Sequence, residues 1–256
     1  MCGRISQYRL PMHYAQRLHL KNPFVLVDAS DRRPGYTLSP GTHPLAIYPD
    51  ETIRAVHWGY CPPWAIQKKL PQTINARVET AATSAYFKAL WRKARILVPA
   101  DGWFEWRVEA GPAGAKPFKQ PYFIRRTDGE PMFLAALTSI QTEDDALVPG
   151  AGLVIVTAAA DEGLVDVHDR RPLVLPPAAA RRWLDPALGA EELAALGSKE
   201  VVAASQFSWH RVSSDVNRVI NDDPRLIEPL EPEQAAQPGQ ASLEFPLDVP
   251  LQSPRS

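Results

Sequence analysis

The chain alternates short apolar runs with turns that are rich in proline and glycine. Apolar runs of this length, bounded by turn residues, are typical of β-strands. Paired runs predict three hairpins and a lone run predicts a short buried strand: 45–48 with 53–58, 102–108 with 122–126, 132–137 with 153–157, and 96–99 alone. Helical spacing of apolar residues predicts helices at 80–92, 178–184 and 191–195. The sequence therefore predicts an α+β fold: a single domain built on a curved, barrel-like, mostly antiparallel β-sheet with flanking helices.

The charge of the chain is divided between a mildly basic body and an acidic tail. The 256 residues have a formal net charge of −1, but residues 228–256 contain five acids and one base. The rest of the chain therefore has a net charge of +3. This balance is compatible with a polyanionic partner without requiring one. We interpret residues 2–228 as one domain and residues 229–256, which are rich in Pro, Gln, Glu and Ser, as a disordered tail.

Cysteine usage and hydropathy predict a cytoplasmic protein. No apolar run approaches the roughly 20 residues of a membrane span, and the first residues lack the pattern of a signal peptide. Cys2 and Cys61 provide neither a disulfide framework nor a four-cysteine metal site. His57, Cys61 and His168 have no recognised zinc-ligand spacing. We therefore expect a reducing cytoplasm, no contact with a membrane, and no metal or cofactor.

Cys2 can become the first residue, because methionine aminopeptidases remove Met1 when the second residue is small. Its α-amine then has a reference pKa near 7.7–8.0, against about 10.4 for lysine, so roughly a tenth of it is neutral at pH 7. The neutral amine can attack an aldehyde, and the adjacent thiol can close the resulting imine into a thiazolidine ring. Alternatively, the amine serves as the base for its own thiol, as in an N-terminal nucleophile hydrolase. A third interpretation gives Cys2 no chemical role.

A single carboxylate lies among aromatic residues in the segment 102–106, which reads Gly-Trp-Phe-Glu-Trp. Strand alternation places Trp103 and Glu105 on one face and Trp106 on the other. A carboxylate that is partly removed from water has a raised pKa, which suits acid–base catalysis near neutral pH. The alternative interpretation is an exposed strand glutamate paired with Arg107.

Two further polar clusters are candidates for binding or catalysis. In 74–80, Asn75 and Arg77 share a face if the segment is extended. Asparagine can orient a sugar oxygen, and arginine can bind a phosphate through two N–H groups. His168 is a candidate acid–base group with an ordinary pKa near 6.5, and Arg170 adds positive charge beside it. The alternatives are a polar helix start for the first cluster and a solvated loop histidine for the second.

The segment 58–64 combines aromatic residues with proline. Exposed tryptophans in such a turn, Trp58 among them, can stack on bases or separate the strands of a duplex. The alternative is packing in the core, which most of the seven tryptophans must satisfy.

The order of these motifs along the chain resembles that of the SOS response-associated peptidase (SRAP) family, the abasic-site processing proteins. The resemblance covers residues 2–228. It depends on five motifs, namely Met-Cys-Gly-Arg at the N-terminus, Trp58-Gly59 with Pro63-Trp64, Asn-Ala-Arg-Val-Glu-Thr at 75–80, Pro99 with 102–106, and His168-Asp169-Arg170 with Pro172.

The resemblance implies a DNA-damage response protein that recognises abasic sites in single-stranded DNA and at junctions with duplex DNA. It implies lyase-like Schiff-base chemistry in which Cys2 forms a covalent thiazolidine cross-link, and removal of Met1 by the protein itself. Asn75 would orient the sugar, Glu105 would be the general acid–base, and His168 would assist sugar opening and cross-link reversal. Location in the cytoplasm, at the nucleoid when bound to DNA, and a monomeric state are expected. The expected DNA contacts are Arg4, Trp58, Arg77, Trp106 and Arg170.

Two positions depart from the pattern of the family. Arg171 stands where methionine is usual, and Ile96 stands where cysteine is frequent. Neither change touches a proposed reacting atom, but Arg171 could alter the face that meets DNA. Two other functions remain open: a cysteine peptidase of the N-terminal nucleophile type that acts on other proteins, and a noncovalent single-stranded DNA-binding module.

Overall fold

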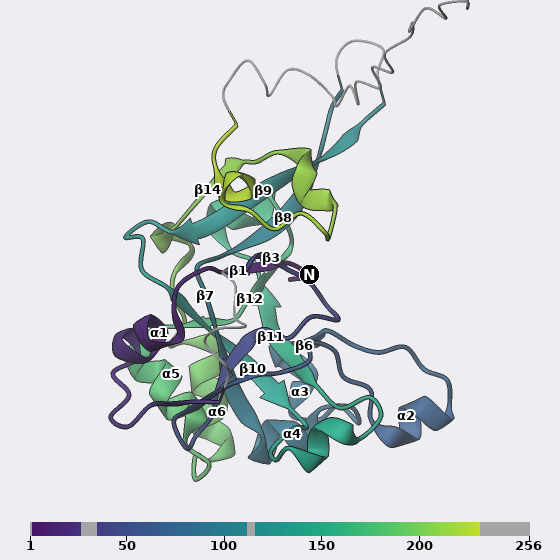
Figure 1. Cartoon of the computed structure of the whole chain (residues 1–256), viewed down its shortest axis with the longest axis vertical. Helices are drawn as coiled ribbons and strands as arrows, with labels where there is room; N and C mark the ends of the chain where they lie inside the picture. The colour runs from purple at the N-terminus through teal and green to yellow at the C-terminus, as the bar shows by residue number, and fades with distance from the viewer. Residues whose placement is uncertain (1, 27–34, 112–115, 231–256) are drawn as a thin grey trace, which may run out of the picture.

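The computed structural model describes residues 2–26, 35–111 and 116–230. Most of the predicted acidic tail, residues 231–256, lies outside the described residues, so its disorder stays a prediction. The described strands form two mostly antiparallel sheets in one α+β domain, and most helices surround the second sheet (Figure 1).

The first sheet contains strands from both ends of the described chain, β1 and β14. The first sheet has the order β14 (Phe207–Arg211), β9 (Phe118–Arg126), β8 (Gly102–Glu109), β1 (Ile5–Gln7) and β3 (Gly35–Leu38). The second has the order β12 (Arg170–Pro172), β11 (Leu153–Ala159), β10 (Met132–Thr138), β7 (Arg95–Ala100), β4 (Leu45–Ile47), β5 (Thr52–Ala55) and β2 (Phe24–Val25). Two strands lie off this path: β13 (Val174–Leu175) pairs with β10, and β6 (Asn75–Arg77) pairs with β11.

The helices are short. The α-helices are α1 (Pro11–Arg17), α2 (Pro63–Gln67), α3 (Val78–Ala81), α4 (Lys88–Lys93), α5 (Pro177–Leu184) and α6 (Ala190–Ser198). The 3₁₀ helices are η1 (Asp144–Leu147), η2 (Glu162–Asp166), η3 (Ala204–Gln206), η4 (Ser214–Asn217) and η5 (Pro224–Ile227). Proline occupies the first turn of α1, α2 and α5, where its missing N–H costs no helical hydrogen bond.

The predicted α+β class and the three predicted hairpins are confirmed by the pairs β4–β5, β8–β9 and β10–β11. The strands form two sheets instead of one, and no barrel closes among the described strands. The helix predicted at 80–92 is wrong in its middle, where α3 ends and α4 has not begun. There the Ser84 hydroxyl accepts the Tyr86 backbone N–H at 3.2 Å, and such side-chain bonds compete with helical ones.

The core lies on both faces of the second sheet, because β10 is buried along its whole length. Phe133 and Leu137 pack in the cluster that faces the helices. Met132 and Leu134 point the other way, into the cluster between the two sheets. A strand that is apolar at every position is expected when both of its faces are covered. Cys2 also belongs to the cluster between the sheets.

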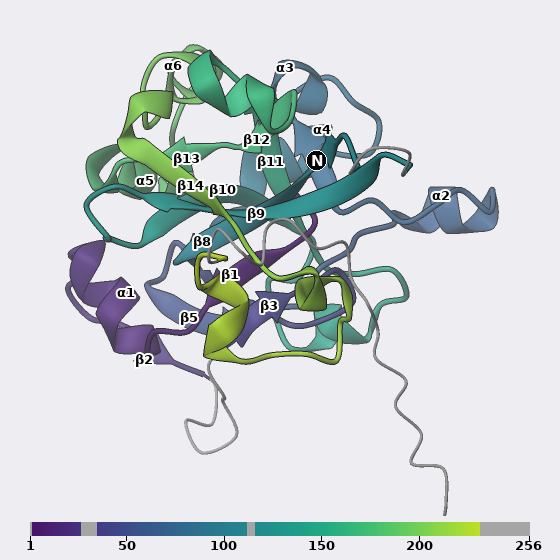
Figure 2. The ribbon, with the colours of Figure 1, turned by 90° about the horizontal axis from the view of Figure 1, so that it is seen from above.

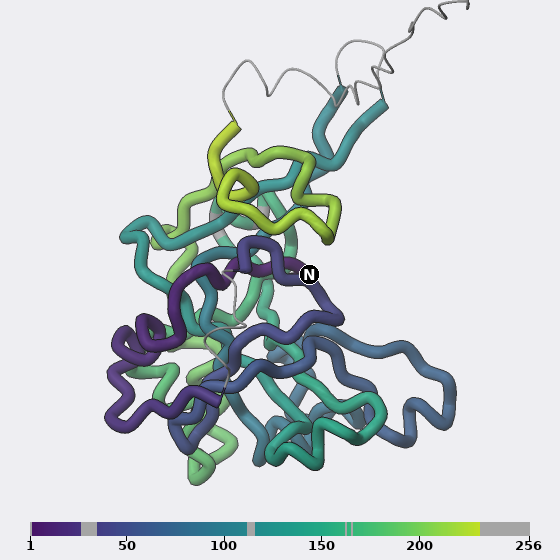
Figure 3. Tube along the Cα trace, viewed as in Figure 1, coloured from purple at the N-terminus to yellow at the C-terminus, as the bar shows by residue number. Residues whose placement is uncertain are grey.

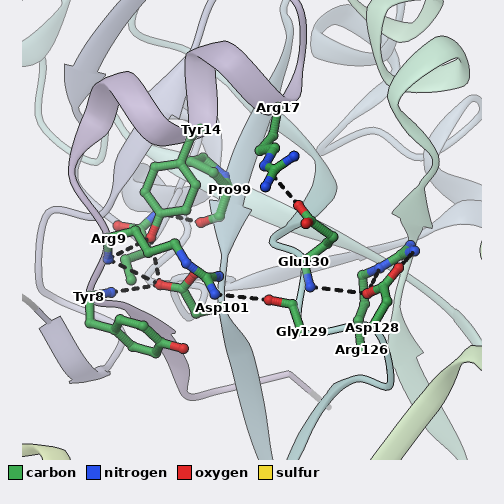
Figure 4. Close-up of polar contacts among 11 residues, drawn as sticks. Tyr8, Arg9, Tyr14, Arg17, Pro99, Asp101, Arg126, Asp128, Gly129 and Glu130 are labelled. Atoms are coloured by element: carbon green, nitrogen blue, oxygen red, sulfur yellow. Dashed lines mark hydrogen bonds and ion pairs between the residues drawn. The ribbon is translucent and has the colours of Figure 1, made fainter.

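A buried carboxylate holds the N-terminal segment beside β7 (Figure 4). Asp101, whose side chain is 0% exposed, forms an ion pair of 2.5 Å with Arg9. It also accepts the Tyr14 hydroxyl at 2.6 Å and the Tyr8 backbone N–H at 2.8 Å. The Asp101 backbone N–H donates in turn to the carbonyl of Ser6 in β1 at 2.7 Å. These contacts fix the part of the chain that follows Cys2.

Replacing Asp101 by alanine is expected to lower the free energy of unfolding by about 3–5 kcal/mol, because it removes a buried carboxylate that pairs with the partly exposed Arg9 and leaves its other donors without an acceptor. The exposed pair between Arg17 and Glu130 offers a matched control, and Glu130→Gln is expected to cost less than about 1 kcal/mol. Urea unfolding of the variants at pH 7 measures both values. Equal losses for the two substitutions would contradict a special role for Asp101.

Candidate active site between the two sheets

Cys2 precedes β1 and lies in the apolar cluster between the sheets. Its side chain is fully buried, at 0% exposure. The side-chain amide of Asn75, in β6, donates to the Cys2 carbonyl oxygen at 3.0 Å. Burial, reinforced by the negative charge of Glu105, raises the pKa of the Cys2 thiol. The thiol therefore stays protonated near neutral pH and needs a base before it can attack.

Glu105 lies in β8, and its side chain is 4% exposed. Burial raises the pKa of Glu105 from 4.5 to about 7. Trp103 and Glu105 line one small cavity, whereas Phe104 and Trp106 belong to a cluster with Val212. This agrees with the predicted strand alternation and excludes the interpretation of Glu105 as an exposed glutamate. At pH 7 this carboxyl can both donate and accept a proton.

His168 follows η2 and faces Glu105. Its Nε2 lies 4.0 Å from Glu105 Oε2, which is too long for a direct hydrogen bond. The Arg170 backbone N–H donates to His168 Nδ1 at 3.0 Å, so the neutral ring carries its proton on Nε2, toward Glu105. Burial lowers the pKa of His168, which favours the neutral ring near pH 7. Asp169 Oδ1 lies 2.9 Å from the same Nδ1 and can accept its proton when the ring is charged.

An open pocket of about 490 Å³ gives access to the two acid–base groups. It is lined by Glu105, Trp106, Lys119, His168 and Asn217. Trp106 Nε1 donates to Asn217 Oδ1 at 2.7 Å, which fixes one wall. Sequence reasoning missed Lys119 and Asn217 because neither lies in a motif. A larger groove of about 930 Å³ between α4 and α6 contains none of the predicted site residues.

The three arginines among the predicted DNA contacts differ in how available their side chains are. Arg77 is exposed, and its side chain makes no hydrogen bond or ion pair with another described residue. Arg4 is buried, its guanidinium donates to the Val216 carbonyl at 2.9 Å, and its Nε has no partner within the described chain. Arg170 holds Glu79 through two bonds of 2.7 and 2.9 Å. A DNA contact by Arg170 would therefore have to break an existing ion pair.

The predicted DNA contact of Trp58 is wrong in this structure. The ring is 0% exposed and its Nε1 donates to the Ile74 carbonyl at 3.0 Å, so neither face is open to a base. Trp64 of the same motif is 36% exposed, and the Lys68 ammonium lies 5.7 Å from its ring centre. Trp64 lies on α2, which extends away from the rest of the domain (Figure 2). The motif therefore exposes a different tryptophan from the one predicted.

Arg171, which could alter the face that meets DNA, is buried, and its effect on DNA binding stays a prediction. Its side chain is 5% exposed and forms a 3.1 Å ion pair with Asp161. It donates to the Val202 carbonyl at 2.9 Å and lies 5.9 Å from the ring centre of Phe207. Arg171 therefore connects the loop before His168 to the chain that leads into β14.

Neither a metal centre nor a membrane span is found in the described part of the chain. No three His, Cys, Asp or Glu side chains gather there in a way that could hold a metal ion. Within the same ranges, each helix is too short or too polar to cross a bilayer.

Comparison with known proteins gives consistent matches. The family model described as SOS response associated peptidase (SRAP) matches residues 1–219. The abasic site processing protein YedK of Escherichia coli is 44% identical, with 90% of this chain and all of that protein covered. The abasic site processing protein YMR114C of Saccharomyces cerevisiae is 33% identical, with 76% of this chain and 52% of that protein covered.

Solved structures agree with the fold. A phage-related protein of Bordetella bronchiseptica matches with a TM-score of 0.67 and 36% identity, over 82% of this chain and 94% of that one. A protein from Bacteroides thetaiotaomicron has the same fold, with a TM-score of 0.71, 24% identity, and 90% and 100% of the two chains covered. The family model and the identity to YedK together show that this chain belongs to the SRAP family.

Proposed function

We propose that this protein binds abasic sites in single-stranded DNA, including sites at junctions with duplex DNA, and captures them as a thiazolidine on Cys2. The strongest support is the geometry of the site, in which Asn75 contacts Cys2 and His168 faces Glu105. The negative charge of Glu105, which helps to raise the pKa of the Cys2 thiol, agrees with this arrangement. These groups come from four separate parts of the chain. The names of the relatives, which describe abasic site processing, agree with this chemistry.

The first bond forms between nitrogen and carbon. After Met1 is removed, the neutral α-amine of Cys2 adds to the aldehyde carbon of the ring-opened sugar, and a proton moves from nitrogen to oxygen. Glu105 in its acid form then protonates the hydroxyl, which leaves as water. The products are an iminium and the Glu105 carboxylate. A carboxyl with a pKa of about 7 is protonated often enough for this step at neutral pH.

The second bond forms between sulfur and carbon. The Glu105 carboxylate takes the thiol proton, the sulfur adds to the iminium carbon, and the iminium electrons return to nitrogen. Because the pKa of the buried thiol is raised, the amine reacts first and the thiol follows only when Glu105 has become a base. Ring closure removes the iminium and so suppresses strand cleavage by β-elimination. The same steps in reverse, assisted by His168, release the DNA.

Four side chains are available for the expected contacts with phosphates and bases. Arg77 is exposed and available, and Arg4 is a buried cation close to the reacting residue. Trp106 lines the pocket and Trp64 is exposed on α2. Because a missing base removes sequence information, binding should depend on the backbone and on stacking, and it should weaken as salt rises. We place the protein, as a monomer, in the cytoplasm and at the nucleoid, with removal of Met1 by the same site.

The test uses the purified full chain and a single-stranded oligonucleotide with one abasic site. Intact-mass measurement should show that Met1 is absent, and a product that survives SDS and heat should form with the abasic strand only. The mass of the product should equal protein plus strand minus one water. Formation of a thiazolidine at Cys2 in full yield would contradict both the peptidase and the noncovalent single-strand binder.

Two results would overturn the proposal in favour of the alternatives. Turnover of casein that is lost when Cys2 is alkylated, without a DNA adduct, would indicate a peptidase. Equal affinity for intact and abasic strands, again without an adduct by mass spectrometry, would indicate a noncovalent single-strand binder.

A further inference from the structure

A small cavity lies beside Glu105. Its volume is about 10 Å³, enough for one water molecule. The cavity has five polar or charged lining residues and three apolar ones, namely Trp103, Glu105, His168, Arg170 and Arg171 with Ile124, Leu164 and Val167. Glu105 and His168 therefore line both the open pocket and this cavity.

Two buried N–H donors at this cavity have no acceptor among the described residues. Trp103 is 1% exposed and its Nε1 has no hydrogen-bond partner there. Arg170 uses its terminal nitrogens for Glu79, but its Nε likewise has no partner. A buried donor without an acceptor has lost its hydrogen bonds to water and gained none in return, so each such group calls for an acceptor.

The distance between Glu105 and His168 also indicates a bound water molecule. The two side chains are 4.0 Å apart at their nearest nitrogen and oxygen, which is too long for a direct bond. A polar gap of this size is commonly bridged by one water molecule. Trp103 and Glu105 are two residues apart on β8, so both side chains leave the strand on the same face.

We propose that the cavity binds one water molecule, held by Trp103 Nε1, which links Glu105 to His168 as a proton relay. This inference rests on the proposed function for its catalytic consequence. The Trp103 N–H donates to the water oxygen, and the water donates to the Glu105 carboxylate. When protonated His168 gives its Nε2 proton to the water, the water gives one of its own protons to Glu105 and is regenerated. His168 then recovers a proton from solvent.

The relay solves a problem that the open pocket creates. DNA bound over that pocket separates Glu105 from bulk water at the stage when the carboxyl must change its protonation state. The cavity water and His168 offer a path for protons that does not pass through the bound sugar, because the His168 side chain is 28% exposed against 4% for Glu105. Trp103 is a positioning residue in this scheme because it touches the water and not the sugar.

Trp103→Phe tests the inference because it removes the N–H and keeps an aromatic ring against Phe207, with which Trp103 now packs edge-on at 5.2 Å. High-resolution crystal structures should show the water in the wild-type protein and its loss or displacement in the variant. Cross-link reversal at pH 7 should slow about fivefold, the size expected for one hydrogen bond. The Glu105 inflection in the pH–rate profile should move to higher pH, because the carboxylate loses a donor.

Trp183→Phe is the matched control: this ring is also buried, but its N–H donates to the Ile96 carbonyl at 3.0 Å. It should lower the melting temperature and leave the pH–rate profile unchanged. A dry cavity in the wild-type crystal structure, or a Trp103→Phe profile equal to wild type, would overturn the relay. Absence of any cross-link with wild-type protein would instead refute the proposed function, and the crystal structures would still decide whether the water is bound.

Discussion

Cys2→Ala protein is expected to form no heat-stable product with an abasic strand, with a loss of at least 100-fold in yield under conditions where the wild-type protein reacts to completion. Alanine keeps an N-terminal amine and can still form an imine. It has no sulfur to close the ring, so the adduct remains hydrolysable. The measurement is a denaturing gel after heating, with mass spectrometry of the product. Borohydride should rescue a reduced imine adduct, which separates loss of ring closure from loss of binding.

Cys61→Ala provides the matched control for this experiment. Cys61 is also buried, but its Sγ contacts only the Leu70 carbonyl, at 3.7 Å, among the hydrogen bonds of the described residues. The control protein should cross-link as the wild type does. A stable product in comparable yield from Cys2→Ala, or its loss from Cys61→Ala alone, would refute the assignment of the nucleophile.

Glu105→Gln is expected to slow cross-link formation by about 100- to 1,000-fold, the range typical of a general acid–base. Affinity for the abasic strand, measured in a Cys2→Ala background, should change less than threefold, because glutamine keeps the shape of the side chain. Glu200→Gln is a remote control, since Glu200 pairs with Arg182 at the surface. Loss of binding in proportion to the loss of rate would instead make Glu105 a structural residue.

The same substitution should have opposite effects on rate and stability. The pKa of Glu105 rises from 4.5 to about 7 on folding, so the folded protein binds more protons than the unfolded chain between these values. Its contribution to stability is therefore present below pH 4.5 and is lost as pH rises through 7. At pH 8 the free energy of unfolding of Glu105→Gln should therefore exceed that of the wild type by up to about 3 kcal/mol, and its melting temperature should be higher. Both differences should vanish near pH 4.

The tube in Figure 3 shows why these residues can act together. The purple N-terminal segment lies below the yellow-green segment near the end of the described chain, and its strand β1 pairs with β8. The hydrogen bond from Arg4 to Val216 joins residues 212 positions apart. A site built from such distant segments is rigid only when the whole domain is folded, which links the proposed activity to the stability of the core.

Much of the chemistry could be predicted from local sequence. An N-terminal cysteine after a removable methionine carries its amine and thiol whatever the fold. The alternation along 102–106 depends only on strand geometry, so the faces of Trp103 and Glu105 followed directly. The hairpins were predictable because turn residues and apolar runs lie next to one another. The order of the motifs indicated the family for the same reason: each motif is short and contiguous.

What only the tertiary structure decided is which of these side chains are buried, paired or exposed. Trp58 and Trp64 occur in one motif, yet only Trp64 is open to solvent. Arg170 pairs with Glu79 across 91 positions, a contact that no local pattern encodes. The pKa of Glu105 likewise depends on the segments that cover it. Strand alternation and the chemistry of each residue are local properties, so the sequence by itself determined them. Burial and ion pairing arise from contacts between distant segments, so only the tertiary structure decided them.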